Sequence, residues 1–86
     1  MLHDLKIDPE YIDDIKFFWK GFEIRKDDRP YEKGDYLWLR GWREGSYTGE
    51  EVLVEVKYIY RGELCRDGYC IMATEVLDSW TVRHDD

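Results

Sequence analysis

The spacing of the apolar residues restricts the fold of this chain more than any other feature. Apolar and polar side chains alternate along residues 20–26, 36–43 and 52–60, while residues 69–77 form a nearly continuous apolar run. Alternation predicts strands with two different faces, and a continuous run is typical of a strand covered on both faces. A fifth, less regular strand is expected at residues 2–7.

One segment has a helical period instead. Asp8 can cap free N–H groups, and Pro9 suits the first position of a helix, so we expect a helix over residues 9–18. Its apolar stripe consists of Tyr11, Ile12, Ile15, Phe18 and Trp19.

Short turns join most of these elements, and residues 44–49 are expected to form a loop. Five strands and one helix in 86 residues predict a β-dominated α+β domain. We expect a partly open antiparallel β-barrel with the helix over one opening. Residues 1–78 are assigned to a single domain and residues 79–86 to a polar C-terminal tail.

Composition indicates a globular chain, with 43% hydrophobic and 38% charged residues. No apolar run approaches the length needed to cross a bilayer, and no signal-peptide core is present, so we expect a cytoplasmic protein without a membrane partner. Cys65 and Cys70 are interpreted as free thiols. With only His3 and His84 to join them, we expect no metal site and no cofactor.

The net charge of −7 argues against nonspecific coating of nucleic acid. The charge is uneven, however, because residues 16–43 carry eight basic and five acidic side chains. This concentration of cations predicts a local surface that faces an anion.

The strand at residues 20–26 is the first candidate site. Alternation places Glu23 and Arg25 on one face, and Phe22 and Ile24 on the other face, towards the core. The remaining charged residues of the candidate site are Lys20, Lys26 and Arg29. An ordinary solvated strand with ion pairs would explain them, and so would a cleft in which cations and a carboxylate hold a nucleotide.

The strand at residues 36–43 is the second candidate. It places Trp38 and Arg40 on one face, together with Tyr36 and Trp42. Aromatic side chains beside an arginine can stack bases, although in so small a domain they can equally belong to the core.

Catalysis has little support in the sequence. No serine or cysteine lies in a nucleophile motif, and no glycine-rich phosphate loop is present. Lys20 and Glu23 form the one pair that could transfer protons, if burial shifts their pKa values towards neutrality.

Several motifs together resemble a small bacterial and phage domain of unknown function that is related to the ASCH group of the PUA-like superfamily. They are His3-x-Leu5-Lys6-Ile7, Pro9-x-Tyr11, Phe22-Glu23-Ile24-Arg25-Lys26-x-Asp28-Arg29, Gly34-Asp35, Tyr47-Thr48-Gly49, Tyr58-Ile59 and Gly68-Tyr69. The sequence differs from its closer relatives at Phe18, where they usually end the helix with glycine.

The resemblance implies a PUA-like barrel, a cleft beside the strand at residues 20–26, and binding of RNA or a modified nucleoside. One ASCH branch hydrolyses acetylated cytidine through a Lys-Thr-x-Thr-x-Arg strand. Lys20 and Arg25 match that pattern, but Gly21 and Glu23 replace its threonines. The resemblance therefore favours a small binding module for RNA or a nucleotide; the alternatives are an amidohydrolase acting on a modified nucleoside and a protein-interaction domain of phage origin.

Overall fold

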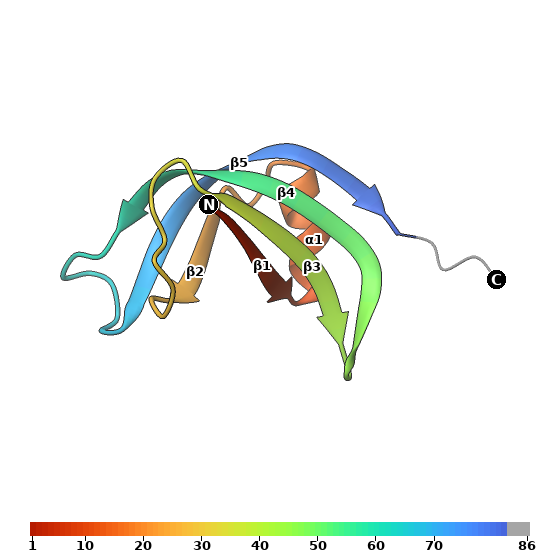
Figure 1. Cartoon of the computed structure of the whole chain (residues 1–86), viewed down its shortest axis with the longest axis horizontal. Coiled ribbons are helices and arrows are strands. Elements are labelled where there is room, and N and C mark those ends of the chain that lie inside the picture. The colour runs from red at the N-terminus through yellow and green to blue at the C-terminus, as the bar shows by residue number, and fades with distance from the viewer. Residues whose placement is uncertain (83–86) are drawn as a thin grey trace.

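The computed structural model describes residues 1–82, which form one helix and a single five-stranded sheet. The elements are β1 (Leu2–Ile7), α1 (Pro9–Lys16), β2 (Phe22–Lys26), β3 (Tyr36–Arg43), β4 (Ser46–Tyr60) and β5 (Tyr69–Thr81). The strands lie in the order β1-β3-β4-β5-β2. Figure 1 shows the sheet curled into an arch with α1 beneath it, so the expected partly open barrel of the α+β class is confirmed.

One pairing differs from the expected antiparallel arrangement. β1 runs parallel to β3, with Leu5 opposite Leu39, whereas the other three pairings are antiparallel. The chain between these two strands spans residues 8–35 and includes α1 and β2. That is long enough for the crossover that a parallel pair needs, so the expectation of short connections is wrong at this edge.

The helix begins where its capping residues predict. The Asp8 carboxylate accepts a hydrogen bond from the Glu10 amide at 3.0 Å, and Pro9 is the first helical residue. The helix ends at Lys16, two residues earlier than expected, because the chain reverses into a left-handed conformation at Phe18.

Two strands are longer than predicted. β4 begins at Ser46 inside the expected loop, since Glu44 and Gly45 both have positive φ and close a tight hairpin. β5 continues to Thr81, which pairs with Glu50, so the expected tail at residues 79–86 starts inside the sheet. Residues 83–86 of that tail lie outside the described residues. The second half of β5 has exposed side chains, so the strand is not covered on both faces.

The core lies between α1 and the concave face of the sheet. Its most completely buried side chains are Ile12, Ile15, Leu37, Leu39, Val52, Val54, Val56, Cys70 and Met72. The side chains of β3 in this list are Leu37 and Leu39, and those of β4 are Val52, Val54 and Val56, so each strand turns one of its two alternating faces inward. At about 1.5–3 kcal/mol for each large apolar side chain removed from water, these contacts hold the helix under the arch.

The predicted faces of β2 are reversed. Glu23 is only 3% exposed, whereas Phe22 and Ile24 are 44% and 57% exposed, so the expected core role of these two residues is wrong. Alternation alone cannot say which face is inside. Here Lys20 and Arg25 neutralise Glu23, which allows the carboxylate to point inward.

Candidate functional site

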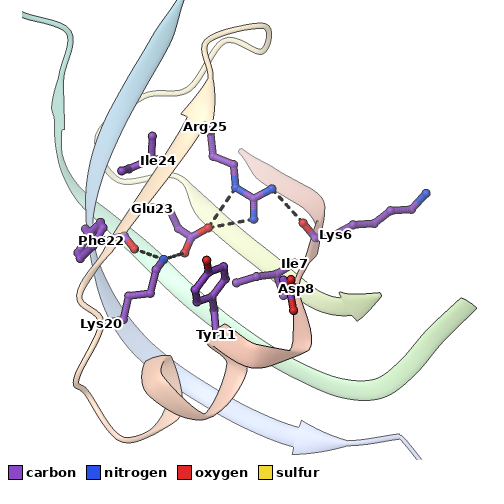
Figure 2. Close-up of a pocket in the computed structure, with 9 residues that line it drawn as sticks. All are labelled: Lys6, Ile7, Asp8, Tyr11, Lys20, Phe22, Glu23, Ile24 and Arg25. Atoms are coloured by element: carbon purple, nitrogen blue, oxygen red, sulfur yellow. Dashed lines mark hydrogen bonds and ion pairs between the residues drawn. The ribbon is translucent and has the colours of Figure 1, made fainter. Parts of the chain in front are cut away.

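The two edge strands of the sheet, β1 and β2, face each other across the opening of the barrel. We call this opening the seam. The Arg25 guanidinium spans it, because Nη1 donates a hydrogen bond to the Lys6 main-chain oxygen at 2.9 Å (Figure 2). Among residues 1–82, neither strand has a second neighbour in the sheet. Two unpaired strand edges therefore border the seam, and a charged side chain connects them across it.

A buried carboxylate lies at the centre of the seam. Lys20 Nζ is 2.5 Å from one oxygen of Glu23, and Arg25 donates to the other oxygen from Nε at 3.1 Å and from Nη2 at 2.9 Å. Lys20 Nζ also donates to the Phe22 main-chain oxygen at 2.6 Å. This cluster satisfies the buried charge, and breaking such a cluster typically costs about 3–5 kcal/mol.

Local sequence explains why these groups meet. Glu23 and Arg25 are two residues apart on β2 and therefore share a face. Lys20 lies just before the strand, and its side chain turns back along it. The main-chain oxygen of Gly21 accepts a hydrogen bond from the Thr74 amide at 3.0 Å, which sets the register of β2 on β5.

A pocket of about 430 Å³ opens over this cluster (Figure 2). It is lined by Lys6, Ile7, Asp8, Tyr11, Lys20, Phe22, Glu23, Ile24 and Arg25. Its volume lies within the range of small-molecule sites, and it combines apolar walls with a few polar groups, as such sites do.

A second pocket of about 420 Å³ adjoins the first and shares Lys6 and Arg25 with it. Its lining includes Lys26 and Arg29 together with Asp4, Leu5, Asp28, Tyr31 and Tyr47. We call the two pockets together the seam groove. The structure thus brings five of the candidate residues, Lys20, Glu23, Arg25, Lys26 and Arg29, to one groove.

The other two candidates do not line the groove, although Arg40 contacts two residues that do, Asp4 at 3.2 Å and Tyr47. Trp38 and Arg40 are on the outer face of β3 and line neither pocket of the groove. The Arg40 guanidinium lies between the rings of Trp38 and Tyr47, at 4.4 and 3.8 Å from their centroids. The Trp38 indole donates to Glu51 at 2.8 Å, so these groups are engaged with their own neighbours.

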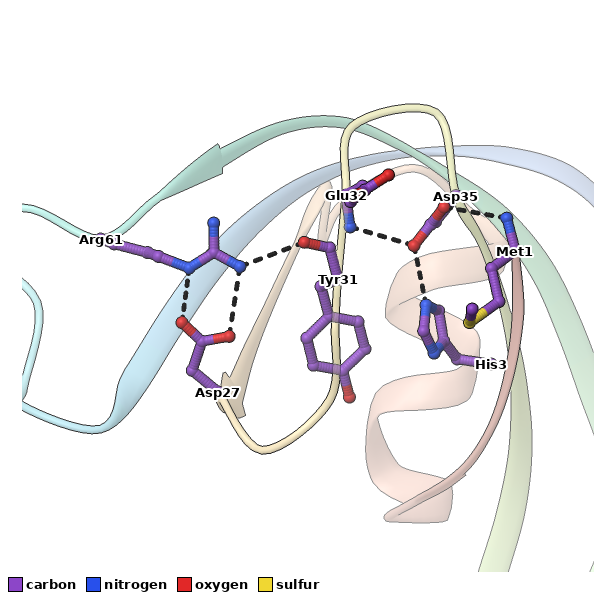
Figure 3. A network of polar contacts seen from close by, with 7 residues as sticks. All are labelled: Met1, His3, Asp27, Tyr31, Glu32, Asp35 and Arg61. Carbon is purple, nitrogen blue, oxygen red and sulfur yellow. Dashed lines mark hydrogen bonds and ion pairs between the residues drawn. The ribbon is translucent and has the colours of Figure 1, made fainter.

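The loop at residues 27–35 closes one side of the second pocket and is held at both ends (Figure 3). Arg61 donates to Asp27 at 2.5 Å and to the Tyr31 main-chain oxygen at 3.1 Å. The burial of Tyr31 raises the pKa of its hydroxyl.

At the other end of this loop, Asp35 accepts hydrogen bonds from the Met1 amine at 2.9 Å and the Glu32 amide at 3.0 Å, and it lies 2.8 Å from His3 Nε2. Burial raises the pKa of Asp35, but its partners outweigh that effect and hold the pKa at about 2. His3 is therefore part of a buried structural network, away from Lys20 and Glu23.

Several groove residues escaped the sequence analysis. Lys6 contributes through its main-chain oxygen, which no side-chain pattern can reveal. Tyr11 was assigned to the apolar stripe of the helix, and Tyr47 to a loop, yet both line the groove. A tyrosine at the solvent edge of an apolar stripe is the one signal that favoured Tyr11.

Within residues 1–82, no group of three or more His, Cys, Asp or Glu side chains is arranged to hold a metal ion. Cys65 and Cys70 are free thiols, and burial raises the pKa of Cys70. No helix in this part of the chain is long and apolar enough to cross a membrane.

Residues 2–74 match the model of a family described as a domain of unknown function, DUF3850. The chain is also similar to an uncharacterized 12.9 kDa protein in the GpA 3' region of Escherichia phage P2, with 41% identity over 51 residues. That match covers 59% of this chain and 47% of the phage protein, so the chain spans about half the length of this relative.

Proposed function

The chain belongs to the DUF3850 family, whose function is unknown, and we propose that it is a small non-enzymatic module that binds RNA or a nucleotide in the seam groove. The observation that carries the proposal is the buried Glu23 carboxylate held between Lys20 and Arg25 beside a pocket of ligand size. A nucleotide offers both the N–H donors and the anionic oxygens that such a cluster recognises.

The hydrogen-bonding capacity of the cluster supports this assignment. Lys20 has three N–H donors and uses two on Glu23 and the Phe22 oxygen, while Arg25 has five and uses three. The remaining donors are available to a ligand. Apolar and aromatic walls from Ile7, Tyr11 and Phe22 suit the face of a base.

The second pocket suits the phosphate. Lys26 and Arg29 are exposed beside Arg25, and arginine binds phosphate through two parallel N–H groups. The resemblance to the PUA-like superfamily supports the same ligand class, because RNA or modified-nucleoside binding is the general expectation for that superfamily.

Titration of the labelled protein with a panel of mononucleotides and short single-stranded RNAs, followed by amide chemical shifts, tests the proposal. We expect the shifts to concentrate at residues 20–29 and at β1. Shifts confined to other elements, or no binding below about 1 mM, which corresponds to roughly −4 kcal/mol, contradict it.

A charge variant tests the phosphate contact. Arg29→Ala should weaken RNA binding and reduce the dependence of log K on log salt by about one unit, because one phosphate contact is lost. Arg43→Ala is the matched control, since Arg43 is also exposed but lines neither pocket. Equal effects of the two substitutions would show that general charge, rather than the groove, attracts the RNA.

A second candidate is an amidohydrolase acting on a modified nucleoside. It is favoured by the 2.5 Å contact between Lys20 and Glu23 in the wall of the pocket, which places a possible acid and base together. Incubation with acetylated cytidine should then give deacetylation that Glu23→Gln and Lys20→Ala abolish. Turnover that persists in both variants removes this candidate.

A further inference from the structure

Three consecutive aromatic side chains follow α1 and face solvent. Phe17, Phe18 and Trp19, here called the aromatic tip, are 60%, 74% and 78% exposed. Each aromatic side chain can remove about 150–250 Å² from water, so the tip leaves several hundred Å² of apolar surface. The rings of Phe17 and Trp19 lie 5.9 Å apart between centroids, and exposed apolar surface of this extent is often functional.

The backbone of the tip is strained without a gain in packing. Phe18 has a φ of 64°, and the amides of Phe18 and Trp19 bond back to Ile15 at 3.1 Å and to Asp14 at 2.8 Å. This helix ending usually places glycine where Phe18 stands. A side chain that costs strain and stays exposed contributes little to folding, which points to a role at the surface.

The aromatic tip is adjacent in sequence to the seam groove. Trp19 precedes Lys20, whose Nζ lies 4.8 Å from the ring centroid of Phe22 and 5.4 Å from that of Tyr11. Both rings line the first pocket, and Figure 2 shows them flanking Lys20. The chain segment that carries the aromatic tip therefore continues directly into the residue that supplies cationic donors to the first pocket.

We propose that the aromatic tip is a stacking platform for the bases next to the nucleotide in the groove, so that the ligand is a single-stranded oligonucleotide. This inference rests on the function proposed above. Such a strand supplies flat apolar faces for the tip and anionic groups for Lys20 and Arg25. An apolar protein surface would cover the tip but leave these donors unused. In this proposal the bases stack on Trp19 and its neighbours and not on Trp38.

The affinity of a mononucleotide is compared with that of a single-stranded hexanucleotide of the same base, in the wild type and in Trp19→Ala. We expect the hexanucleotide to bind at least tenfold more tightly to the wild type. Trp19→Ala should weaken the hexanucleotide by roughly 5-fold to 150-fold, the range for loss of one stacked base, and leave the mononucleotide unchanged. Its salt dependence should stay constant, because no phosphate contact is removed.

A direct readout is the indole N–H resonance of Trp19, assigned by its loss in Trp19→Phe. It should move with the hexanucleotide and stay in place with the mononucleotide. Leu64→Ala is the matched control for removal of an exposed apolar side chain. Leu64 is 92% exposed in the loop that contacts the Asp27 end of β2, opposite the tip, so its removal should change neither affinity.

Three results would overturn the platform while leaving the groove intact: equal affinities for the two ligands, an unchanged hexanucleotide affinity in Trp19→Ala, or a concentration-dependent dimer that Trp19→Ala dissociates. The last result would assign the tip to contact with a second copy. If neither the mononucleotide nor the hexanucleotide binds, the proposed function fails together with the platform.

Discussion

The position of Glu23 shows how a single residue can reverse the apparent pattern of a strand. A carboxylate is normally kept in water because its burial is costly. Here one oxygen meets Lys20 and the other accepts two hydrogen bonds from Arg25, so the buried charge is compensated within three neighbouring side chains. The exposed positions of Phe22 and Ile24 are the consequence.

Phe18 is the residue at which a substitution should stabilise the chain. Phe18→Gly relieves the left-handed strain of an exposed side chain, and we expect the free energy of unfolding to rise by about 1 kcal/mol in urea denaturation. Phe18→Ala is the control, because it removes the ring and keeps the strain. A gain in Phe18→Ala equal to that in Phe18→Gly would assign the effect to the ring.

At the scale of elements, the loop between β2 and β3 matters most for the groove. It forms one wall of the second pocket and is fixed by Asp35 at one end and Arg61 at the other (Figure 3). These contacts keep Arg29 near Arg25, although the loop contains no helix or strand. The groove wall therefore depends on polar contacts of ionisable groups such as Asp35, whose charge changes with pH.

Asp35 should make the stability of this loop depend on pH. Its pKa is about 2 in the folded protein against an ordinary value of 3.8, so its contribution is present above the ordinary value and is lost as the pH falls towards 2. We expect Asp35→Asn to lower the free energy of unfolding by about 2 kcal/mol at pH 7, and the difference from wild type to shrink below pH 4.

Urea denaturation at pH 7, 4 and 2.5 measures this dependence. Asp67→Asn, in the exposed loop before β5, is the control and should have little effect at any pH. A difference between Asp35→Asn and wild type that is the same at all three values would contradict the assignment.

At the scale of the whole molecule, the barrel stays open because β1 and β2 do not pair with each other. The Arg25 side chain connects the two edges through the Lys6 oxygen, which leaves room for the groove on either side. Unpaired strand edges usually invite association with other chains, and covering side chains are one protection against it.

Arg25→Lys should loosen the seam while keeping the charge. Lysine lacks the planar group that reaches Glu23 and the Lys6 oxygen together, so we expect a loss of about 2 kcal/mol in the free energy of unfolding. Hydrogen exchange of the β1 and β2 amides should accelerate more than that of β4. Lys26→Ala is the control, and uniform acceleration across the sheet would show global destabilisation instead.

Local pattern was sufficient for much of the fold. Period two in residues 36–43 predicts β3 with the observed bounds and puts Leu37 and Leu39 on one face, which the structure places in the core. The cap at Asp8 predicts the start of α1. Clustered charges also indicated the residues that now line the groove, because neighbours on one short strand stay neighbours in any fold.

The sequence by itself therefore determined the elements, the α+β class and the charged strand, since these depend on spacing along the chain. Only the tertiary structure decided which face of β2 is inside, that β1 is parallel to β3, and that Lys6 meets Arg25 across the seam. The last two of these features depend on contacts between residues 19 or more positions apart. Local periodicity carries no information about such contacts, so the seam groove appears only when the sheet has curled.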